Sequence, residues 1–351
     1  MDRAVDLYEQ SLSLPIGEEK LELLQKAIRI AAIDESEQFQ FALHSTLMEV
    51  GLEAGRGDLL SLAFAWCIER YDRNPEQYSH HFLWAYRWVI NELGGFQDIP
   101  VAQVTQLLSD MKVRYENAGL SLRPCYVLEM NVFPVLGDLA AADSAYQIWP
   151  TLPNDEFSDG KDSELDFTIN HLSRMGQYEA ALKKAQPILK GRRGTAHSRG
   201  EVCSQLLIQT WQAGNLELAQ EMHIIGYECN RQEERQVDRI GEHIAYLALT
   251  KQFDEALEIG AHWTSIASQS VRFYAKLIYF LRACILGPAL INAGIAEIPH
   301  KVAEQLGLSG NTSAELSTYL LNQSHQLTEL FDKRNGNNYF EELLKKHLQL
   351  L

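Results

Sequence analysis

The sequence predicts an all-α protein, and three observations lead to this fold class. Leu occurs 49 times and Ala 33 times, whereas Val and Ile together occur 35 times, so good helix formers outnumber β-branched residues. No segment alternates apolar and polar residues with the period of two that marks a half-buried strand. A short string of turn residues also recurs along the chain at nearly constant spacing. We therefore expect helices joined by regularly spaced turns.

The recurring string contains a turn residue, an apolar residue two places later and Ala five places later, which Leu replaces in the first copy. The copies are Gly57/Leu59/Leu62, Gly137/Leu139/Ala142, Gly176/Tyr178/Ala181, Gly214/Leu216/Ala219 and Lys251/Phe253/Ala256, with weaker turns at Gly17 and Gly95. Gly ends one helix in the left-handed conformation, and the small residue lets the next helix approach closely. Because a single hairpin cannot bury its apolar faces, such hairpins must stack. The sequence thus predicts a right-handed α-solenoid of about seven helical hairpins.

The expected helices follow from apolar residues at helical spacing between these turns. The expected pairs are 1–14 with 18–32, 36–53 with 58–71, 77–93 with 101–118, 122–136 with 139–149, 162–175 with 177–189, 199–213 with 215–230, and 236–250 with 252–265. We expect the repeats to occupy residues 1–265, weakly in 1–121 and most clearly in 122–265. Residues 266–351 should form a helical C-terminal cap, because terminal repeats must present a polar outer face. Within this cap we expect a long apolar helix at 268–286, an irregular Gly/Pro region at 287–311, and helices at 312–333 and 338–350.

The charge balance excludes one large class of partners. With 47 Asp and Glu against 31 Lys and Arg, the formal net charge is −16, whereas nucleic-acid binding needs clustered cations. We therefore expect no direct contact with nucleic acid. The five cysteines are scattered without a CxxC pair, which favours the reducing cytoplasm.

Membrane association is also not expected. The N-terminal ten residues carry three acids and one Arg and lack the pattern of a signal peptide. The most apolar stretch, Phe273 to Ile298, is interrupted by Lys276, Arg282 and the helix-breaking Gly287-Pro288. We interpret it as a buried capping helix.

Motifs that carry known chemistry are missing from the sequence. It contains no HExxH, GxSxG, GxxxxGK[ST] or GxGxxG string, and its eleven histidines are dispersed. We therefore expect no catalytic residue, no bound metal and no cofactor.

At the turn strings the chain resembles the tetratricopeptide-repeat class of helical hairpin proteins, with divergent repeats. The stretches 241–249 and 329–340 are also similar to bacterial tetratricopeptide-like proteins of unassigned role. The resemblance implies that ligands lie on a concave surface lined by the first helix of each hairpin. Projected onto this chain, that surface implies Tyr86, Asn131, Asn170, Arg174, Gln205 and Trp211 as partner-binding residues.

Two loops between hairpins carry opposite charge. Residues 154–166 contain six acids and one Lys, whereas residues 183–199 contain six Lys and Arg and no acid. The two loops either neutralise each other, or Arg192 and Arg193 form a docking site for an acidic segment or a phosphate. A third interpretation is simple complementarity with the helix ends.

The function predicted from these observations is a non-catalytic protein- or peptide-binding scaffold in the cytoplasm. One alternative is an enzyme on a closed toroid of helical hairpins, as in some glycoside hydrolases, which would need two carboxylates facing one cavity. Another alternative is a regulatory protein that senses a peptide and controls a separate DNA-binding partner. The sequence does not identify the partner or the oligomeric state.

Overall fold

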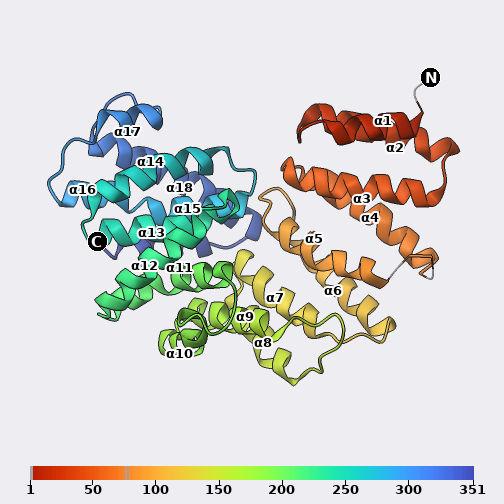
Figure 1. Ribbon diagram of the computed structural model, residues 1–351, viewed down its shortest axis with the longest axis horizontal. Helices are drawn as coiled ribbons and strands as arrows, with labels where there is room; N and C mark the ends of the chain where they lie inside the picture. Colours follow the sequence, from red (N-terminus) through yellow and green to blue (C-terminus); the bar gives the residue numbers. More distant parts are fainter. Residues whose placement is uncertain (1–2, 76, 79) are drawn as a thin grey trace. The chain divides into compact units, whose positions relative to one another are not determined.

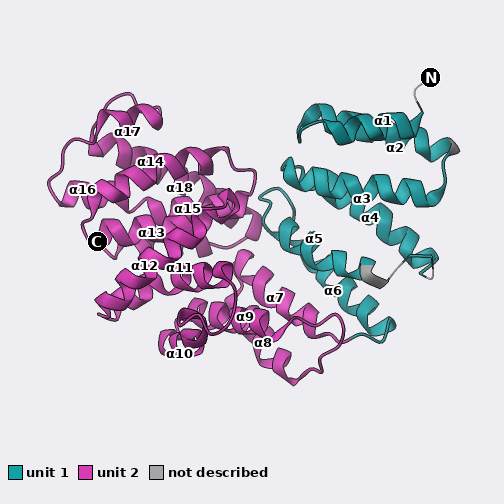
Figure 2. Ribbon diagram, in the orientation of Figure 1, with its two compact units in different colours: residues 1–120 teal, residues 121–351 magenta. Residues whose placement is uncertain are grey.

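A computed structural model describes residues 3–75, 77–78 and 80–351 of the chain (Figure 1). Across these residues the regular structure is helical, and the only β-structure is an isolated bridge between Glu297 and Thr312. The predicted all-α fold class is therefore confirmed. The chain divides into two compact units, residues 1–120 and residues 121–351 (Figure 2).

Unit 1 contains three successive pairs of packed helices. They are α1 (Ala4–Ser13) with α2 (Glu18–Asp34), α3 (Glu37–Glu53) with α4 (Gly57–Arg73), and α5 (Ala85–Gly94) with α6 (Val101–Asn117). A 3-10 helix, η1 (His80–Trp84), leads into α5, so the helix expected to begin at residue 77 begins later. Helices α2 and α3 also pack together, as do α4 and α5, which links the pairs in chain order.

Unit 2 begins with four more pairs. They are α7 (Arg123–Val135) with α8 (Leu139–Ile148), α9 (Lys161–Arg174) with α10 (Tyr178–Leu189), α11 (Ala196–Gln212) with α12 (Leu216–Asn230), and α13 (Val237–Leu249) with α14 (Phe253–Gln269). Short 3-10 segments, η2 (Trp149–Thr151) and η3 (Glu234–Gln236), follow α8 and precede α13. The C-terminal part adds α15 (Phe273–Ala283), α16 (Leu286–Asn292), α17 (His300–Gln305), α18 (Ser313–Asn335) and α19 (Tyr339–Leu348).

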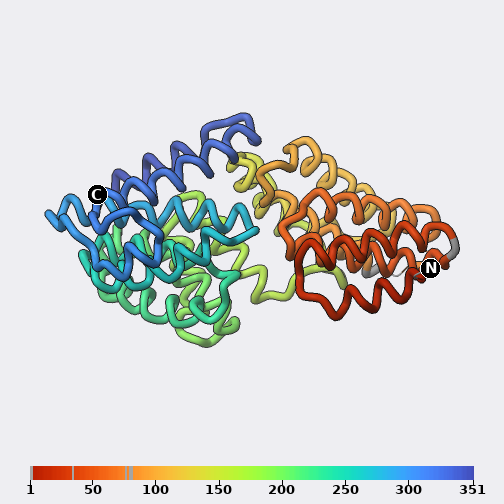
Figure 3. The backbone as a smooth tube through the Cα atoms, turned by 90° about the horizontal axis from the view of Figure 1, so that it is seen from above, coloured from red at the N-terminus to blue at the C-terminus, as the bar shows by residue number. Residues whose placement is uncertain are grey.

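The first helices of consecutive hairpins pack side by side in unit 2. Helix α9 contacts α11, α11 contacts α13, and α13 contacts α15, so these helices form one layer. A continuous apolar core extends from Val135 to Leu344 through this layer and its covering helices. Helix α18 packs on α15 and α16, and the chain then turns back so that α19 runs beside α18 (Figure 3).

The turn string has the backbone geometry that the sequence predicts at four hairpins. Gly137, Gly176 and Gly214 have φ of 77°, 70° and 78°, and Lys251 has φ of 61°. The small residues of the same copies, Ala142, Ala181, Ala219 and Ala256, are at most 1% exposed. These four copies are therefore tight helical hairpins whose second helix packs closely on the first.

The first copy of the string was placed two residues too late. The left-handed residue is Gly55, with φ of 70°, while Gly57 is the first residue of α4. A Cβ on Gly57 would lie 2.9 Å from the Phe96 ring, so this glycine permits a close approach of α4 to the segment between α5 and α6. Leu60, five places after Gly55, is fully buried, whereas Leu62 is 64% exposed. The weaker turns at Gly17 and Gly95 also lack the left-handed conformation.

The apolar C-terminal stretch forms two helices where the sequence indicated one helix and an irregular region. Gly287 and Pro288 lie in the first turn of α16, where proline costs no hydrogen bond. Within the described part of the chain, residues 273–292 are the stretch long and apolar enough to cross a membrane by length and composition, and 61% of it is buried inside the unit.

The turn between α18 and α19 is bonded to the end of α7. Asn335 Nδ2 and Arg334 Nη2 donate to the Val135 carbonyl at 3.0 and 3.2 Å, and Asn337 Nδ2 donates to the Leu136 carbonyl at 2.9 Å. These carbonyls belong to the last turn of a helix and have no partner within it. The C-terminal helices are thereby fastened to the beginning of unit 2.

Candidate functional site

A groove in unit 2 is lined by α9, α11, α13, α15 and α19. Its volume is about 440 Å³, within the range of roughly 300–1,000 Å³ that is typical of ligand sites. The layer of first helices supplies most of its lining. Helix α19 supplies Tyr339, Leu343, Lys346 and His347, and Leu350 follows just after this helix. The groove is therefore lined by the first helices of successive hairpins, with the C-terminal helix as an additional wall.

Three of the six residues projected as partner-binding line this groove. Asn170 and Arg174 come from α9, and Gln205 comes from the adjacent α11. The side-chain oxygen of Gln205 is buried and has no hydrogen-bond partner among the described residues. Asn131 on α7 is half-buried and is not part of the lining, and Trp211 is half-buried against the main core of the unit.

Tyr86 does not have a surface position, which corrects the prediction. Its side chain is fully buried, with its ring edge-on to Phe64 at 4.7 Å between centroids. The Arg114 guanidinium lies 5.6 Å from its ring centroid. Burial raises the pKa of Tyr86, while Arg114 opposes the shift. The aromatic residue therefore belongs to the core of unit 1, because α5 turns this face inward.

Ion pairs order the floor of the groove on α13 and α15. Arg239 contacts Glu201 at 3.1 Å between Nη2 and Oε1, and its Nε lies 3.5 Å from Asp238 Oδ2. Arg282 Nε lies 2.9 Å from Glu242 Oε1. Burial raises the pKa of Glu242, while Arg282 and Arg239 oppose the shift. These pairs hold both groove carboxylates of α13 against arginines.

The contact between α15 and α19 depends on a buried neutral histidine. His347 Nε2 donates to the Arg282 carbonyl at 3.0 Å, which leaves Nδ1 to accept from Arg282 Nη1 at 3.3 Å. Burial and the adjacent Arg282 lower the pKa of His347 to about 3. The imidazole therefore stays uncharged at neutral pH and fixes α19 beside the groove.

Sequence reasoning missed the groove residues on α13, α15 and α19. The α13 and α15 residues continue the pattern of first helices, so extending the projection by two helices would have found them. Tyr339 and Leu343 lie one turn apart on α19 and line the groove as an apolar stripe, which Leu350 continues just after the helix ends. The sequence shows this apolar stripe. It does not show which helices the stripe faces, because the position of α19 depends on contacts with residues far away along the chain.

Arg192 and Arg193 are exposed in the loop between α10 and α11. Arg193 Nε lies 3.1 Å from Oδ1 of Asp162, which belongs to the acidic segment 154–166 and lies in the first turn of α9. This ion pair supports mutual neutralisation of the two loops. Between charged groups this exposed, the pair contributes about 0–1 kcal/mol.

A buried polar chain in unit 2 has the residue types of a hydrolase site but not its accessibility. His243 Nε2 lies 2.9 Å from Ser204 Oγ, His243 Nδ1 lies 3.1 Å from His223 Nδ1, and His223 Nε2 lies 3.5 Å from Glu255. Ser204 and His243 are fully buried, and Ser204 donates its proton to the Gly200 carbonyl. The hydroxyl therefore cannot reach a substrate, and the chain joins α11 to α14 structurally.

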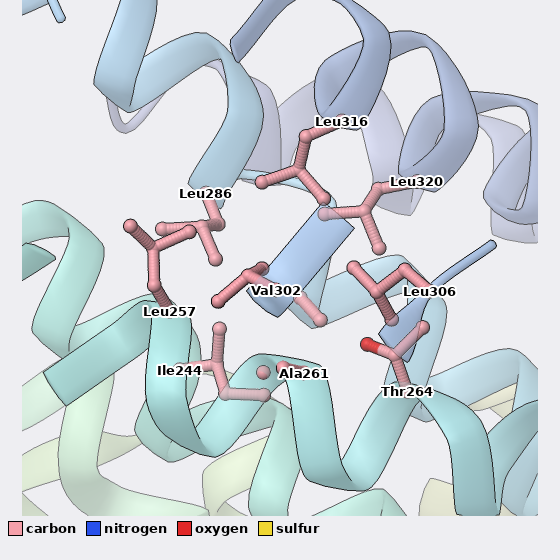
Figure 4. Close-up of a pocket in the computed structure, with 11 residues that line it drawn as sticks. Ile244, Leu257, Ala261, Thr264, Leu286, Val302, Leu306, Leu316 and Leu320 are labelled. Carbon is pink, nitrogen blue, oxygen red and sulfur yellow. The ribbon is translucent and has the colours of Figure 1, made fainter. Parts of the chain in front are cut away.

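Other places in unit 2 are less suitable for a ligand. Apolar side chains of α13, α14, α16, α17 and α18 converge on a cavity of about 10 Å³, with Thr264 at its edge (Figure 4). This volume holds about one water molecule, so the cavity is a packing defect of the core. Among the described residues, no three His, Cys, Asp or Glu side chains are grouped to hold a metal ion.

Comparisons of the chain with protein families, with curated proteins and with solved structures find no match.

Proposed function

We propose that this chain is a non-catalytic, protein- or peptide-binding scaffold of the tetratricopeptide-like kind, acting in the cytoplasm. In this proposal its hairpins form a right-handed α-solenoid, the C-terminal helices form the cap, and the groove of unit 2 binds the partner. The carrying observation is that the groove is lined by the first helices of successive hairpins. Its lining combines polar and apolar side chains, as needed to hold a polypeptide by many modest contacts.

Two further observations support this proposal. The left-handed turn residues and buried alanines of four hairpins agree with the repeat string from which the resemblance was drawn. The groove also presents an amide that can bond a peptide backbone, since Gln212 is exposed on its lining. An exposed amide of this kind exchanges its hydrogen bonds with water for hydrogen bonds with the peptide.

Site-specific photo-crosslinking tests the location of the binding surface. A photoreactive residue replaces Gln212, which lines the groove, and in a matched variant it replaces Glu221, an exposed residue of α12. In cells that produce the protein naturally, we expect Gln212 to crosslink a defined partner and Glu221 not to crosslink it. The partner should be lost when Asn170, Arg174 and Gln205 are changed together to Ala.

Circular dichroism provides the folding control for this triple variant. Polar surface substitutions usually change the free energy of unfolding by less than about 0.5 kcal/mol each, so helicity should be retained. A partner that crosslinks equally at Gln212 and Glu221, or that survives the triple substitution, would show that the groove is not the binding surface.

One observation favours an enzyme as the second candidate. Asp238 and Glu242 lie one turn apart on α13 and both line the groove, and burial raises the pKa of Glu242 as it does in many general acids. Each carboxylate, however, lies against an arginine. Hydrolysis of a polysaccharide by the wild-type chain, abolished by Glu242→Gln, would replace the scaffold proposal with this one.

A further inference from the structure

The charges that line the groove do not cancel. Its cations are Arg174, Arg239, Arg282 and Lys346, and its acids are Asp238 and Glu242. Arg239 and Arg282 are engaged by these two acids and by Glu201. The remaining cations are therefore Arg174 of α9 and Lys346 of α19.

Neither of these two cations has a carboxylate partner among the described residues. On α19 the acids Glu341 and Glu342 are both engaged by Lys345, at 2.9 and 3.0 Å, which leaves Lys346 for the groove. Arg174 ends α9, where it forms no ion pair with the described part of the chain. Two unpaired cations in one groove are notable in a chain with a net charge of −16.

The two cations come from the first and the last of the helices that line the groove. The charge of Arg174 acts on Tyr339, which lies at the beginning of α19. Burial and Tyr274 raise the pKa of this tyrosine, whereas Arg174 and Arg282 oppose the rise. Lys346 lies seven residues further along α19, which corresponds to about 10 Å of helical rise. An extended peptide covers this length of α19 in about three residues.

We infer that the groove selects an acidic peptide segment, with carboxylates paired to Arg174 and Lys346. This inference rests on the proposed binding function and names the chemical class of its ligand. The apolar stripe of α19, with Tyr274 and Ile278 of α15, contacts the uncharged side chains between the acids. With a net charge of −16 the chain as a whole repels such a segment, whereas the local positive charge of the groove attracts it.

Selection from a displayed library of random peptides tests this inference on the full chain. We expect the selected peptides to be enriched in Asp and Glu relative to the starting library, and to crosslink at a photoreactive residue placed at Gln212. Charge reversal by Arg174→Glu or Lys346→Glu should weaken each selected peptide by about tenfold or more. The interaction should also weaken as salt is added.

Arg192→Glu is the matched control, because it makes the same change in net charge at an exposed loop outside the groove. It should leave the affinity of the peptides within about twofold. Peptides without acidic enrichment that still crosslink at Gln212 would overturn the inference and leave the binding function intact. If no selected peptide crosslinks at Gln212, both the inference and the proposed function are wrong.

Discussion

Lys251 occupies a backbone position that glycine holds in the other hairpins of its kind. Among the described residues it is the one non-glycine residue with positive φ, and Gly137, Gly176 and Gly214 stand at the equivalent turns. The left-handed conformation costs a residue with a Cβ about 1–2 kcal/mol. The turn before α14 therefore keeps its geometry because the packing of the hairpin imposes it.

Lys251→Gly should consequently stabilise unit 2. The relief of backbone strain exceeds the additional freedom that glycine gives the unfolded chain, and the expected net gain is about 0.5–1 kcal/mol in the free energy of unfolding. The reciprocal change Gly214→Lys should cost a similar amount. Urea denaturation measures both, and a loss of stability in Lys251→Gly would contradict the turn geometry.

Two glycines inside helices of unit 2 have opposite surroundings. A Cβ on Gly260 of α14 would meet only Leu286 Cδ2, at 3.4 Å, beside the small cavity of Figure 4. A Cβ on Gly287 of α16 would lie 2.3 Å from the Ser317 Cα of α18. The first glycine is tolerated, whereas the second permits the contact between two helices.

Substituting alanine at each position should separate these roles. Gly260→Ala gains helix propensity and should raise the free energy of unfolding by about 0.5–1 kcal/mol. Gly287→Ala must push two backbones apart and should lower it by about 1–3 kcal/mol, as overpacking does. Thermal denaturation compares the pair, and equal melting temperatures would mean that the α16 and α18 backbones are not in this contact.

Local signals in the sequence predicted the elements, and contacts between distant residues limited the prediction. The turns at Gly137, Gly176 and Gly214 are encoded within a few residues, so their geometry followed from the string alone. The sequence indicated that Pro288 ends a helix, because proline breaks a helix in its interior. In the structure α15 already ends at Ala283, so Pro288 lies in the first turn of the next helix, where it is tolerated.

The candidate site was predictable where its residues belong to the repeats, and it was not predictable where distant parts of the chain meet. Asn170, Arg174 and Gln205 lie on neighbouring first helices, and a projection of one repeat onto the next placed them together. Lys346 and the rest of the α19 wall are brought to the groove by a fold-back that no repeat encodes. Tyr86 was misplaced because the helix containing it begins at Ala85, later than expected.

The whole molecule contains several histidines that are buried in an uncharged form. Burial and Arg70 lower the pKa of His44 in unit 1 to about 4, and the pKa of His347 in unit 2 is about 3. Burial also lowers the pKa of His171, His223 and His243. In the unfolded chain these imidazoles take up protons near pH 6.5, whereas in the folded chain they do so only at lower pH.

Stability should therefore fall as the pH decreases below about 6.5. Between pH 6.5 and 5, His44 and His347 should each remove up to about 2 kcal/mol from the unfolding free energy of their own unit. His347→Gln can still donate to the Arg282 carbonyl and should reduce this loss in unit 2. Urea denaturation at pH 7 and pH 5 measures the effect, with the exposed His262 changed to Gln as control. Equal losses in wild type and His347→Gln would contradict the prediction.

The bonds from Arg334, Asn335 and Asn337 to the end of α7 also impose an order on synthesis. They join residues 199 to 201 positions apart, so the Val135 and Leu136 carbonyls emerge from the ribosome long before their partners. At about 5–20 residues per second, this delay is roughly 10–40 s. During that interval the layer of first helices exposes the surface that α19 later flanks. A nascent chain is therefore open to premature ligands and to chaperones until its last helix is made.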